Sequence, residues 1–335
     1  MNYRVLGKTG YKITEIGVGT WQLGGGWGQK FDDKLAEATL NKAIDLGFNF
    51  IDTADSYSDG LSENVVGRVV RSRKEKVYIA SKIGRRLKPH NTEGYNEQNI
   101  RKFIEDSLKN LGVDKIDLIQ LHCPTTEVYY RPQIFELMDR IVEEGKVAHY
   151  GVSVQQVEQA LKAIEYPNVA TVQIVFNMFR QRPANILFNE AKKRSVGIIA
   201  RVPLASGLLS GKYSGETKFP DQDHRIEYKL GKSIDYDPYE YGMRGETFGG
   251  VNYSIGVNAV EDLKKILPED KFAQYALKWI LMFDAVSVTV VGAANAKHLE
   301  SNYLASALPN LNDKQMRAIK AVYDKYFLKD IHHIW

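Results

Sequence analysis

Eight short apolar segments recur along the chain, and their alternation with stretches of helical periodicity constrains the fold more than any other feature. Within these segments hydrophobic residues follow one another without regular polar alternation, which is typical of parallel strands buried on both faces. Strands that alternate with helices in one continuous series predict an α/β protein, a (β/α)8 TIM barrel. The segments lie at 15–21, 48–52, 77–82, 117–122, 148–153, 170–175, 197–202 and 286–292.

The stretches between these segments carry apolar residues at helical spacing. The clearest covers 98–111, with Gly112 placed to end the helix. No change of composition and no linker divides the chain, so 1–335 is expected to form a single barrel domain. Further helices are expected at 33–46, 131–144, 155–165, 185–195, 270–283, 297–307 and 312–326.

Two segments depart from this repeat. The start of the chain, with apolar residues on both sides of Lys8-Thr9-Gly10, predicts a small N-terminal hairpin that closes the bottom of the barrel. From about 211 to 257, after the seventh strand, the sequence is polar and rich in glycine and tyrosine. A structureless loop of this length is generally functional or flexible. We therefore expect a long loop over the C-terminal mouth of the barrel, either a lid over a site or a disordered insertion.

The charge and cysteine content restrict the class of partner. Lys and Arg number 45 against 41 Asp and Glu, a net charge of +4 that suits a phosphate-bearing small molecule and is too weak to indicate nucleic acid. Cys123 is the single cysteine, which excludes an internal disulfide and favours a reducing compartment. The N-terminus has no signal-peptide pattern, and no uncharged apolar run reaches about 18 residues. We expect a cytoplasmic protein, monomeric or weakly oligomeric, with no membrane partner.

Polar residues stand at the ends of three consecutive predicted strands. Asp52 ends the second, Lys82 the third and His122 the fourth, and Tyr57 follows Asp52 in the same loop. In a (β/α)8 barrel the C-terminal strand ends meet at one mouth, where the chemistry takes place. A carboxylate at a buried strand end needs a partner, and Lys82 can neutralise Asp52. The ammonium group is then expected to lower the pKa of Tyr57 and make it a better general acid.

The chain carries a set of short motifs in a fixed order, DTADSYSDG (52–60), ASK (80–82), LH (121–122), GVS (151–153), VQIVFN (172–177) and VPLASGLLSGKY (202–213). The set resembles the aldo-keto reductase superfamily over essentially the whole chain. The resemblance implies a tetrad, Asp52, Tyr57, Lys82 and His122, that reduces a carbonyl with hydride from a nicotinamide nucleotide. Tyr57 would protonate the carbonyl oxygen, Lys82 held by Asp52 would tune Tyr57, and His122 would orient the substrate oxygen.

The resemblance also implies the cofactor NADP(H), with NAD(H) as the alternative, and a small-molecule aldehyde or ketone as substrate. The cofactor positions fall on the first strand, on the ends of the second, fifth, sixth and seventh strands, and in the segments after the seventh and eighth. They are Gly19, Thr20, Trp21, Asp52, Ser153, Gln173, Arg201, Pro203, Leu204, Ala205, Ser206, Gly207, Leu208, Lys212, Gly292, Ala293, Asn295, His298 and Asn302.

Some of these positions depart from the family pattern. Val154 stands where an Asn usually contacts the nicotinamide amide. Arg201 stands where an aromatic ring usually stacks on the nicotinamide; its flat guanidinium would either stack there or pair with a carboxylate of the long loop. Gly292 and His298 stand where Lys and Arg usually surround the 2′-phosphate of NADPH. We expect His298, with Lys297 beside it, to support a moderate NADPH preference that strengthens as pH falls.

Other interpretations stay open. Barrels of this family also serve as potassium-channel β-subunits, so a nucleotide-binding sensor with little turnover is the main alternative. A third hypothesis is an aldolase in which Lys82 forms a Schiff base. The His332-His333 pair has no third ligand spaced near it, so no metal site is expected. The tail 329–335 packs either on the surface of the barrel or across a partner.

Overall fold

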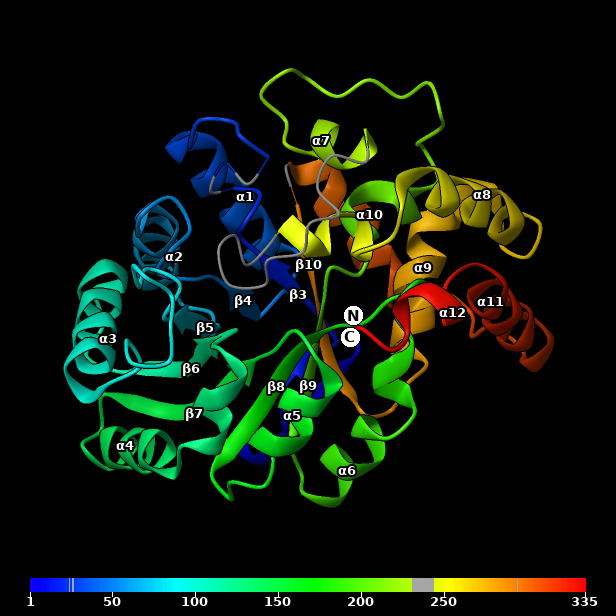
Figure 1. Ribbon diagram of the computed structural model, residues 1–335. Helices are drawn as coiled ribbons and strands as arrows, with labels where there is room; N and C mark the ends of the chain where they lie inside the picture. Colours follow the sequence, from blue (N-terminus) through cyan, green and yellow to red (C-terminus); the bar gives the residue numbers. More distant parts are fainter. Residues whose placement is uncertain (24, 26, 231–243, 294) are drawn as a thin grey trace.

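The computed structural model describes residues 1–335 except 24, 26, 231–243 and 294, and a closed barrel of parallel strands forms its centre (Figure 1). The strands follow one another around the barrel in the order β10-β3-β4-β5-β6-β7-β8-β9. Each of them lies where the sequence predicted a strand, which confirms the (β/α)8 barrel. Their bounds are β3 Ile16–Gly19, β4 Phe50–Asp52, β5 Tyr78–Ile83, β6 Ile116–His122, β7 Val147–Ser153, β8 Val169–Val175, β9 Gly197–Arg201 and β10 Val286–Gly292.

Helices surround the barrel, as the predicted alternation requires (Figure 1). In α3, Asn96 caps the N-terminus by accepting a hydrogen bond from the Asn99 N–H at 3.0 Å, and Gly112 ends the helix in the left-handed conformation. Gly112 therefore ends this helix, as the sequence predicted. The surrounding helices are α1 Asp33–Asp45, α2 Leu61–Ser72, α3 Glu97–Leu111, α4 Pro132–Glu143, α5 Val157–Ala163, α6 Leu187–Lys193, α9 Phe272–Leu281, α10 Ala296–Ala305, α11 Asp313–Tyr326 and α12 Leu328–Ile331.

The sequence prediction missed α2. This helix contains Gly67, which weakens the helical pattern because glycine is a poor helix former. A Cβ at Gly67 would collide with the backbone oxygen of Leu111, at the end of α3. Gly67 is therefore required by the close approach of two helices, a constraint that cannot be seen in the local sequence.

The segment after β9 is only partly a loop. The prediction of a structureless stretch over 211–257 was wrong for part of its length, because it contains α7 (Arg225–Lys229), the 3-10 helix η5 (Arg244–Gly249) and the start of α8 (Tyr253–Lys264). Residues 231–243 of that predicted loop lie outside the described residues. Asn252 explains where α8 begins, since its side chain accepts hydrogen bonds from the first N–H groups of the helix.

The predicted N-terminal hairpin is present. β1 (Tyr3–Val5) pairs antiparallel with β2 (Lys12–Thr14). Leu6 and Ile13 of this hairpin are fully buried, and they form one apolar cluster with side chains of the barrel strands, among them Phe50. Because apolar contacts fill this end of the barrel interior, buried polar side chains are left to gather at the opposite, C-terminal mouth.

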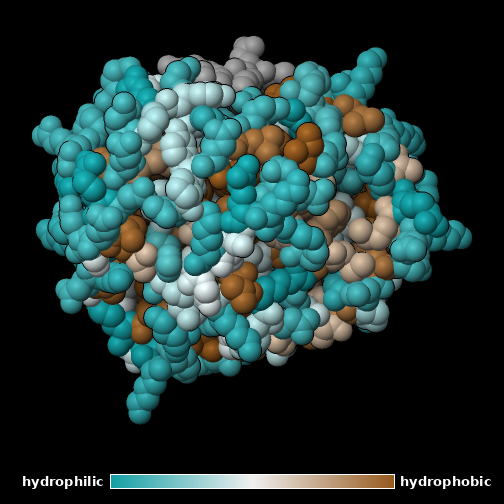
Figure 2. Space-filling view, turned by 90° about the horizontal axis from the view of Figure 1, so that it is seen from below, coloured by the Kyte–Doolittle hydropathy of each residue, from teal (hydrophilic) through white to brown (hydrophobic). Residues whose placement is uncertain are grey.

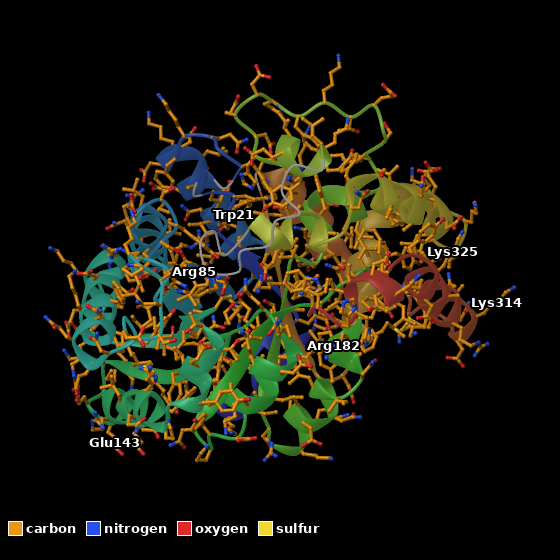
Figure 3. The ribbon with its side chains drawn as sticks, in the orientation of Figure 1. Trp21, Arg85, Glu143, Arg182, Lys314 and Lys325 are labelled. Carbon is orange, nitrogen blue, oxygen red and sulfur yellow. The ribbon has the colours of Figure 1, made fainter. Side chains whose placement is uncertain are left out.

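One face of the outer surface is mainly polar. In the view of Figure 2 hydrophilic residues dominate and hydrophobic ones form small, scattered groups. Charged side chains such as Glu143, Lys314 and Lys325 project outward from the helices, whereas Trp21 and Arg85 lie further inward (Figure 3). In the described ranges of the chain, no helix combines the length and apolar character that crossing a membrane requires.

Candidate active site

The predicted tetrad lies at the C-terminal mouth of the barrel. Asp52 ends β4, Lys82 lies next to the end of β5 and His122 ends β6. The relative exposure is 4% for Asp52, 1% for Lys82 and 3% for His122, so the barrel wall holds each side chain in place. Tyr57 follows in the loop between β4 and α2. The parallel strands thus bring together four side chains that are up to 70 positions apart in the sequence.

Lys82 connects the members of this group. Its Nζ donates hydrogen bonds to Asp52 Oδ2 at 2.7 Å, to the Thr53 carbonyl at 2.7 Å and to the Tyr57 hydroxyl at 3.3 Å. The expected ion pair between Lys82 and Asp52 is therefore confirmed. Gln173 donates to the other carboxylate oxygen of Asp52 at 2.8 Å. Both oxygens of this buried carboxylate are bonded, which offsets the cost of burying the charge.

The pKa values show which protons are held at neutral pH. Burial acts to lower the pKa of Lys82, but Asp52 and Tyr57 together raise it, so the ammonium stays charged. Lys82 acts to lower the pKa of Tyr57, as expected, but the expectation that the pKa falls below its ordinary value was wrong. Burial raises the pKa of Tyr57 above its ordinary value, and Lys82 only opposes that rise. Tyr57 therefore keeps its proton, as a proton donor must.

His122 is held neutral. Burial lowers its pKa well below the ordinary value, and the positive charges of Lys82, Arg85 and Arg201 lower it further. Its ring centroid lies 6.1 Å from that of Tyr57, in an edge-to-face arrangement. Within the described residues, its Nδ1 has no hydrogen-bond partner. A neutral imidazole beside the Tyr57 hydroxyl can form a hydrogen bond to a substrate oxygen without competing as a charged acid.

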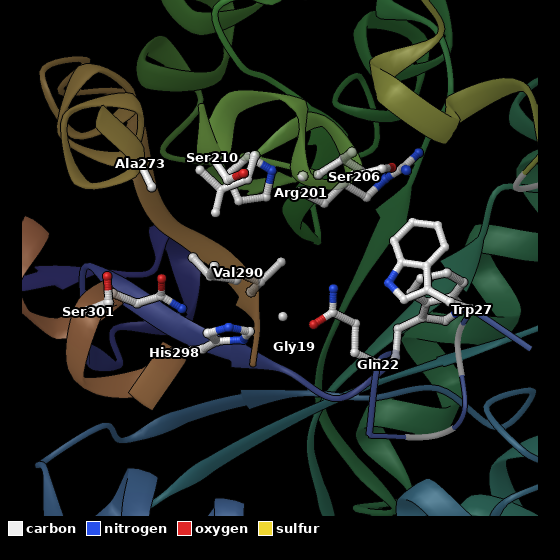
Figure 4. Close-up of a pocket in the computed structure, with 18 of the residues that line it drawn as sticks. Gly19, Gln22, Trp27, Arg201, Ser206, Ser210, Ala273, Val290, His298 and Ser301 are labelled. Carbon is white, nitrogen blue, oxygen red and sulfur yellow. The ribbon is translucent and has the colours of Figure 1, made fainter. Parts of the chain in front are cut away.

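A cavity of about 760 Å³ is lined by Tyr57 and His122 at its catalytic end and by His298 and Ser301 of α10. Figure 4 shows His298 and Ser301 on one side of this cavity and Trp27 on the other. Most of the cofactor positions assigned from the sequence lie on its wall. This size is in the range of cavities that enclose a small molecule or cofactor. The assigned residues that line it are Gly19, Trp21, Asp52, Gln173, Arg201, Pro203, Leu204, Ser206, Gly207, Lys212, Gly292, His298 and Asn302.

Six of the assigned residues do not line the cavity. Thr20 hydrogen-bonds the Asp52 carbonyl and accepts from Ser62 behind the wall, so it supports the strand end. The Ser153 hydroxyl lies 3.5 Å from the Cys123 sulfur, and both groups are buried. Asn295 caps α10 by accepting from the His298 N–H. The other three, Ala205, Leu208 and Ala293, are buried apolar residues.

Arg201 forms an ion pair, one of the two outcomes expected for it. Its guanidinium pairs with Glu246 of η5, and it also donates to the Val154 carbonyl at 2.8 Å. Both side chains are buried at the cavity wall. Burial acts to lower the pKa of Arg201, but Glu246 raises it, so the guanidinium stays charged. The segment after β9 thus contributes a charged group to the site.

The segment after β9 also has a backbone shape that fits phosphate groups. It forms the 3-10 helix η4 (Ala205–Ser210), in which Ser206 and Gly207 have left-handed φ values of 53° and 104°. A Cβ at Gly207 would lie 2.6 Å from the Tyr213 hydroxyl, so glycine is required there. Turns of this kind can present backbone N–H groups to an anion, and Lys212 follows on the cavity wall. These residues fit the pyrophosphate of a nucleotide.

The far end of the cavity carries two basic side chains, Lys212 and His298, and two carboxylates. Partial burial lowers the pKa of His298, and the Lys212 ammonium lowers it further, so His298 is neutral at pH 7 without a ligand. Glu269 and Asp270 line the same cavity and were not identified from the sequence. No local signal distinguishes these two carboxylates from other exposed helix-start residues.

The sequence analysis also missed an aromatic wall near the catalytic end. Trp27 packs edge-on against Trp21, with ring centroids 4.5 Å apart, and lies 5.1 Å from the ring of His224. The Arg225 guanidinium lies 4.2 Å from the Trp27 ring centroid. Two loops far apart in sequence therefore meet beside the cavity. Only the glycine-rich surroundings of Trp27 hinted at a special loop.

Comparisons with known proteins identify the family of the chain. The sequence matches the model of the Aldo/keto reductase family over residues 15–324. It is 25% identical over 322 residues to an aldo-keto reductase of Schizosaccharomyces pombe named for NADP(+), with 93% of this chain and 89% of that one covered. It is 27% identical over 340 residues to a probable voltage-gated potassium channel subunit beta of Oryza sativa subsp. japonica, with 96% of each chain covered.

The fold agrees with a solved structure as well. The glycerol dehydrogenase of Gluconobacter oxydans superimposes with a TM-score of 0.75 at 24% identity, covering 97% of this chain and 96% of that one. Because the family model spans nearly all of the barrel, from β3 to α11, the chain belongs to the aldo/keto reductase family.

Proposed function

We propose that this protein reduces small aldehydes or ketones to alcohols with NADP(H), using Tyr57 as the general acid. The observation that carries the proposal is the position of Lys82, whose Nζ lies 3.3 Å from the Tyr57 hydroxyl and 2.7 Å from Asp52 at the wall of the cavity. The aldo/keto reductase family and the S. pombe relative named for NADP(+) support the reaction class and the cofactor.

The residues of the chain would act on the carbonyl oxygen. Tyr57 is protonated at neutral pH and lines the cavity, so its hydroxyl can donate a proton to that oxygen. Charged Lys82 then stabilises the negative charge left on Tyr57. Neutral His122 orients the oxygen through a hydrogen bond. The bound nicotinamide nucleotide would supply the hydride to the carbonyl carbon.

The remainder of the cavity would hold the nucleotide. Gln173 lies at the catalytic end, where it is bonded to Asp52, and the η4 turn with Ser206 fits the pyrophosphate. Lys212 and His298 would face the phosphate at the adenosine end, which supports NADP(H), with NAD(H) as the weaker ligand. The proposal includes one catalytic domain over 1–335, a cytoplasmic location and a monomer or weak oligomer, in line with the single Cys123 and the modest charge.

The direct test is a panel of aldehydes, ketones and sugars with NADPH. We expect absorbance at the nicotinamide band to fall, with one alcohol formed for each NADPH consumed and the alcohol identified by mass. Consumption of NADPH without an alcohol, or no consumption with any carbonyl, would contradict the proposal.

The potassium-channel relative supports one alternative, a nucleotide-binding sensor. Tight NADPH binding with no turnover on the panel would favour it. A Schiff-base aldolase has less support, because Lys82 is charged and bonded to Asp52, and a charged ammonium is not a nucleophile. Borohydride trapping of a carbonyl on Lys82 would reverse that judgement.

A further inference from the structure

The C-terminal tail packs on the barrel of its own chain. After α12, His332 Nδ1 lies 2.7 Å from the Tyr323 hydroxyl of α11, and Gln156 donates to the Ile334 carbonyl at 3.1 Å. Arg182 donates to the Trp335 backbone oxygen at 2.7 Å. The relative exposure of Trp335 is only 5%. Of the two outcomes expected for the tail, the structure therefore shows contact with the barrel surface.

The Trp335 side chain covers Arg180. The centre of the guanidinium lies 3.8 Å from the Trp335 ring centroid, and the relative exposure of Arg180 is 3%. Arg180 closes a tight turn after β8 by forming a backbone bridge with Asn177. The Asn177 side chain in turn donates a hydrogen bond to the Val202 carbonyl after β9. A guanidinium is planar, so an aromatic ring stacked on it fixes the direction of its N–H groups.

One of those N–H groups holds η5. Arg180 donates to the Gly249 carbonyl at 3.2 Å. On its other side, η5 reaches the cavity through Glu246, which pairs with Arg201, and through Thr247. The η5 segment therefore contacts Arg180 at Gly249 and the cavity wall at Glu246.

The backbone of η5 depends on such contacts. Phe248 has a φ of 58°, in the left-handed region that is unfavourable for a bulky residue. Its N–H donates to the Ser206 hydroxyl of η4 at 3.1 Å. Strained positions of this kind persist only when the surroundings fix them, and Ser206 and Arg180 are two such supports.

We propose that Trp335 is a positioning residue for the site: by stacking on Arg180 it fixes Glu246–Gly249 and thereby sets the affinity of the cavity for its nucleotide. The inference rests on the proposed function for the identity of that nucleotide. Trp335 touches none of the tetrad residues in the contacts described above, so its loss should weaken binding and leave the chemical step largely intact.

The first test is hydrogen–deuterium exchange of the full chain. We expect Trp335→Ala to speed exchange of two amides of this segment by about tenfold, because loss of the stack lets the segment open more often. These are the Phe248 amide and the Gly250 amide, which donates to the Thr247 carbonyl at 3.0 Å. Trp335→Phe should restore most of the protection. The matched control is Ile331→Ala, a buried residue of the same tail whose aliphatic side chain cannot stack on a guanidinium.

The second test is NADPH affinity, measured by fluorescence titration with the same variants. We expect about a tenfold rise in Kd for Trp335→Ala, little change for Trp335→Phe and Ile331→Ala, and a KM effect larger than any kcat effect. If Trp335→Ala does not fold, Arg180→Lys, which keeps the charge and loses the planar fork, should give the same pattern.

Equal effects of Trp335→Ala and Ile331→Ala on exchange would overturn the inference, since the tail would then act only through general stability. Unchanged exchange of the Phe248 and Gly250 amides in Trp335→Ala would overturn it as well. The exchange experiment needs no carbonyl turnover, so a failure of the proposed function is seen separately, in the substrate panel.

Discussion

The two ends of the cavity are built from different parts of the fold. At the catalytic end the side chains come from rigid strand ends, and Asp52 has both oxygens bonded, to Lys82 and to Gln173. At the far end Lys212 and His298 come from a loop and the first turn of α10, and His298 is only partly buried. In the proposed function the chemistry therefore depends on the barrel strands, whereas nucleotide selection would depend on a loop and a helix start that can vary without disturbing those strands.

The largest expected effect on kcat and stability follows from removing the Lys82 charge at the catalytic end. Lys82→Met should lower kcat by at least about 10²-fold, because the charge that stabilises the Tyr57 anion is lost. It should also lower the free energy of unfolding by roughly 3–5 kcal/mol, because Asp52 is left buried without its partner. Steady-state kinetics and urea unfolding measure the two effects.

The matched change at the far end is Lys212→Met, which removes the same charge from a loop. It should leave kcat and unfolding nearly unchanged and raise the NADPH Kd. If the two substitutions cost the same in stability, the distinction between the two ends is wrong.

A second buried carboxyl, Asp55, lies three residues after Asp52 in the loop that follows β4, but its oxygens have no hydrogen-bond partner like Lys82 among the described residues. Burial, and then the Glu63 carboxylate, raises the pKa of Asp55 to about 8. In the unfolded chain the group ionises near its ordinary value of 3.8. Folded Asp55 therefore holds a proton that the unfolded chain releases, and its contribution to stability is lost as pH rises from about 4 to 8.

We expect Asp55→Asn to reduce this loss by roughly 2 kcal/mol between pH 5 and 7, measured by urea unfolding at several pH values. Asp59→Asn, an exposed change in the same loop, is the control. The same pH slope in Asp55→Asn and the wild type would show that Asp55 is ionised in the folded protein.

A smaller effect is expected at His298. Its pKa is lowered in the free protein by partial burial and by Lys212, so it gains a proton only at acidic pH or next to an anion. The preference for NADPH over NADH should strengthen as pH falls from 8.5 to 5.5, by about tenfold, and should lose this dependence in His298→Ala. Dissociation constants of both nucleotides give the ratio. A flat ratio in the wild type would remove His298 as the partner of the 2′-phosphate.

The smallest expected effect concerns the segment after β9. The lid hypothesis for residues about 212–257 predicts that a bound nucleotide protects this segment from protease, and that release of product or cofactor limits turnover. Limited proteolysis should cleave this segment in the free protein and spare it with NADPH present. Equal cleavage in both states would leave the segment as an insertion without a lid function.

The strand ends explain why much of the site could be predicted. Asp52, Lys82 and His122 are fixed by the register of neighbouring parallel strands, so finding the strands is enough to place them together. The pairing of Arg201 was anticipated only as one of two outcomes, because Glu246 lies 45 positions away in a segment with weak periodicity. The wall formed by Trp21 and Trp27 depends on how two loops meet, and no spacing rule encodes that contact.

Energy balances were harder to predict than positions. The sign of the Tyr57 pKa shift was wrong because burial outweighs the nearby ammonium, and the depth of burial is a property of the packed fold. The need for glycine at position 67 could not be predicted for a similar reason, since it arises from the packing of α2 on α3. Local sequence patterns predict the order of helices and strands. The balance between burial and charge that sets a pKa depends on long-range packing.

The role of Tyr57 as proton donor is tested by the single-turnover rate of hydride transfer in Tyr57→Phe, with the NADPH Kd measured on the same sample. We predict a rate lower by about 10²–10⁴-fold with an unchanged Kd, because only the proton donor is removed. Tyr130→Phe, a change at an exposed tyrosine, should match the wild type. A Tyr57→Phe rate close to that of the wild type would contradict the account.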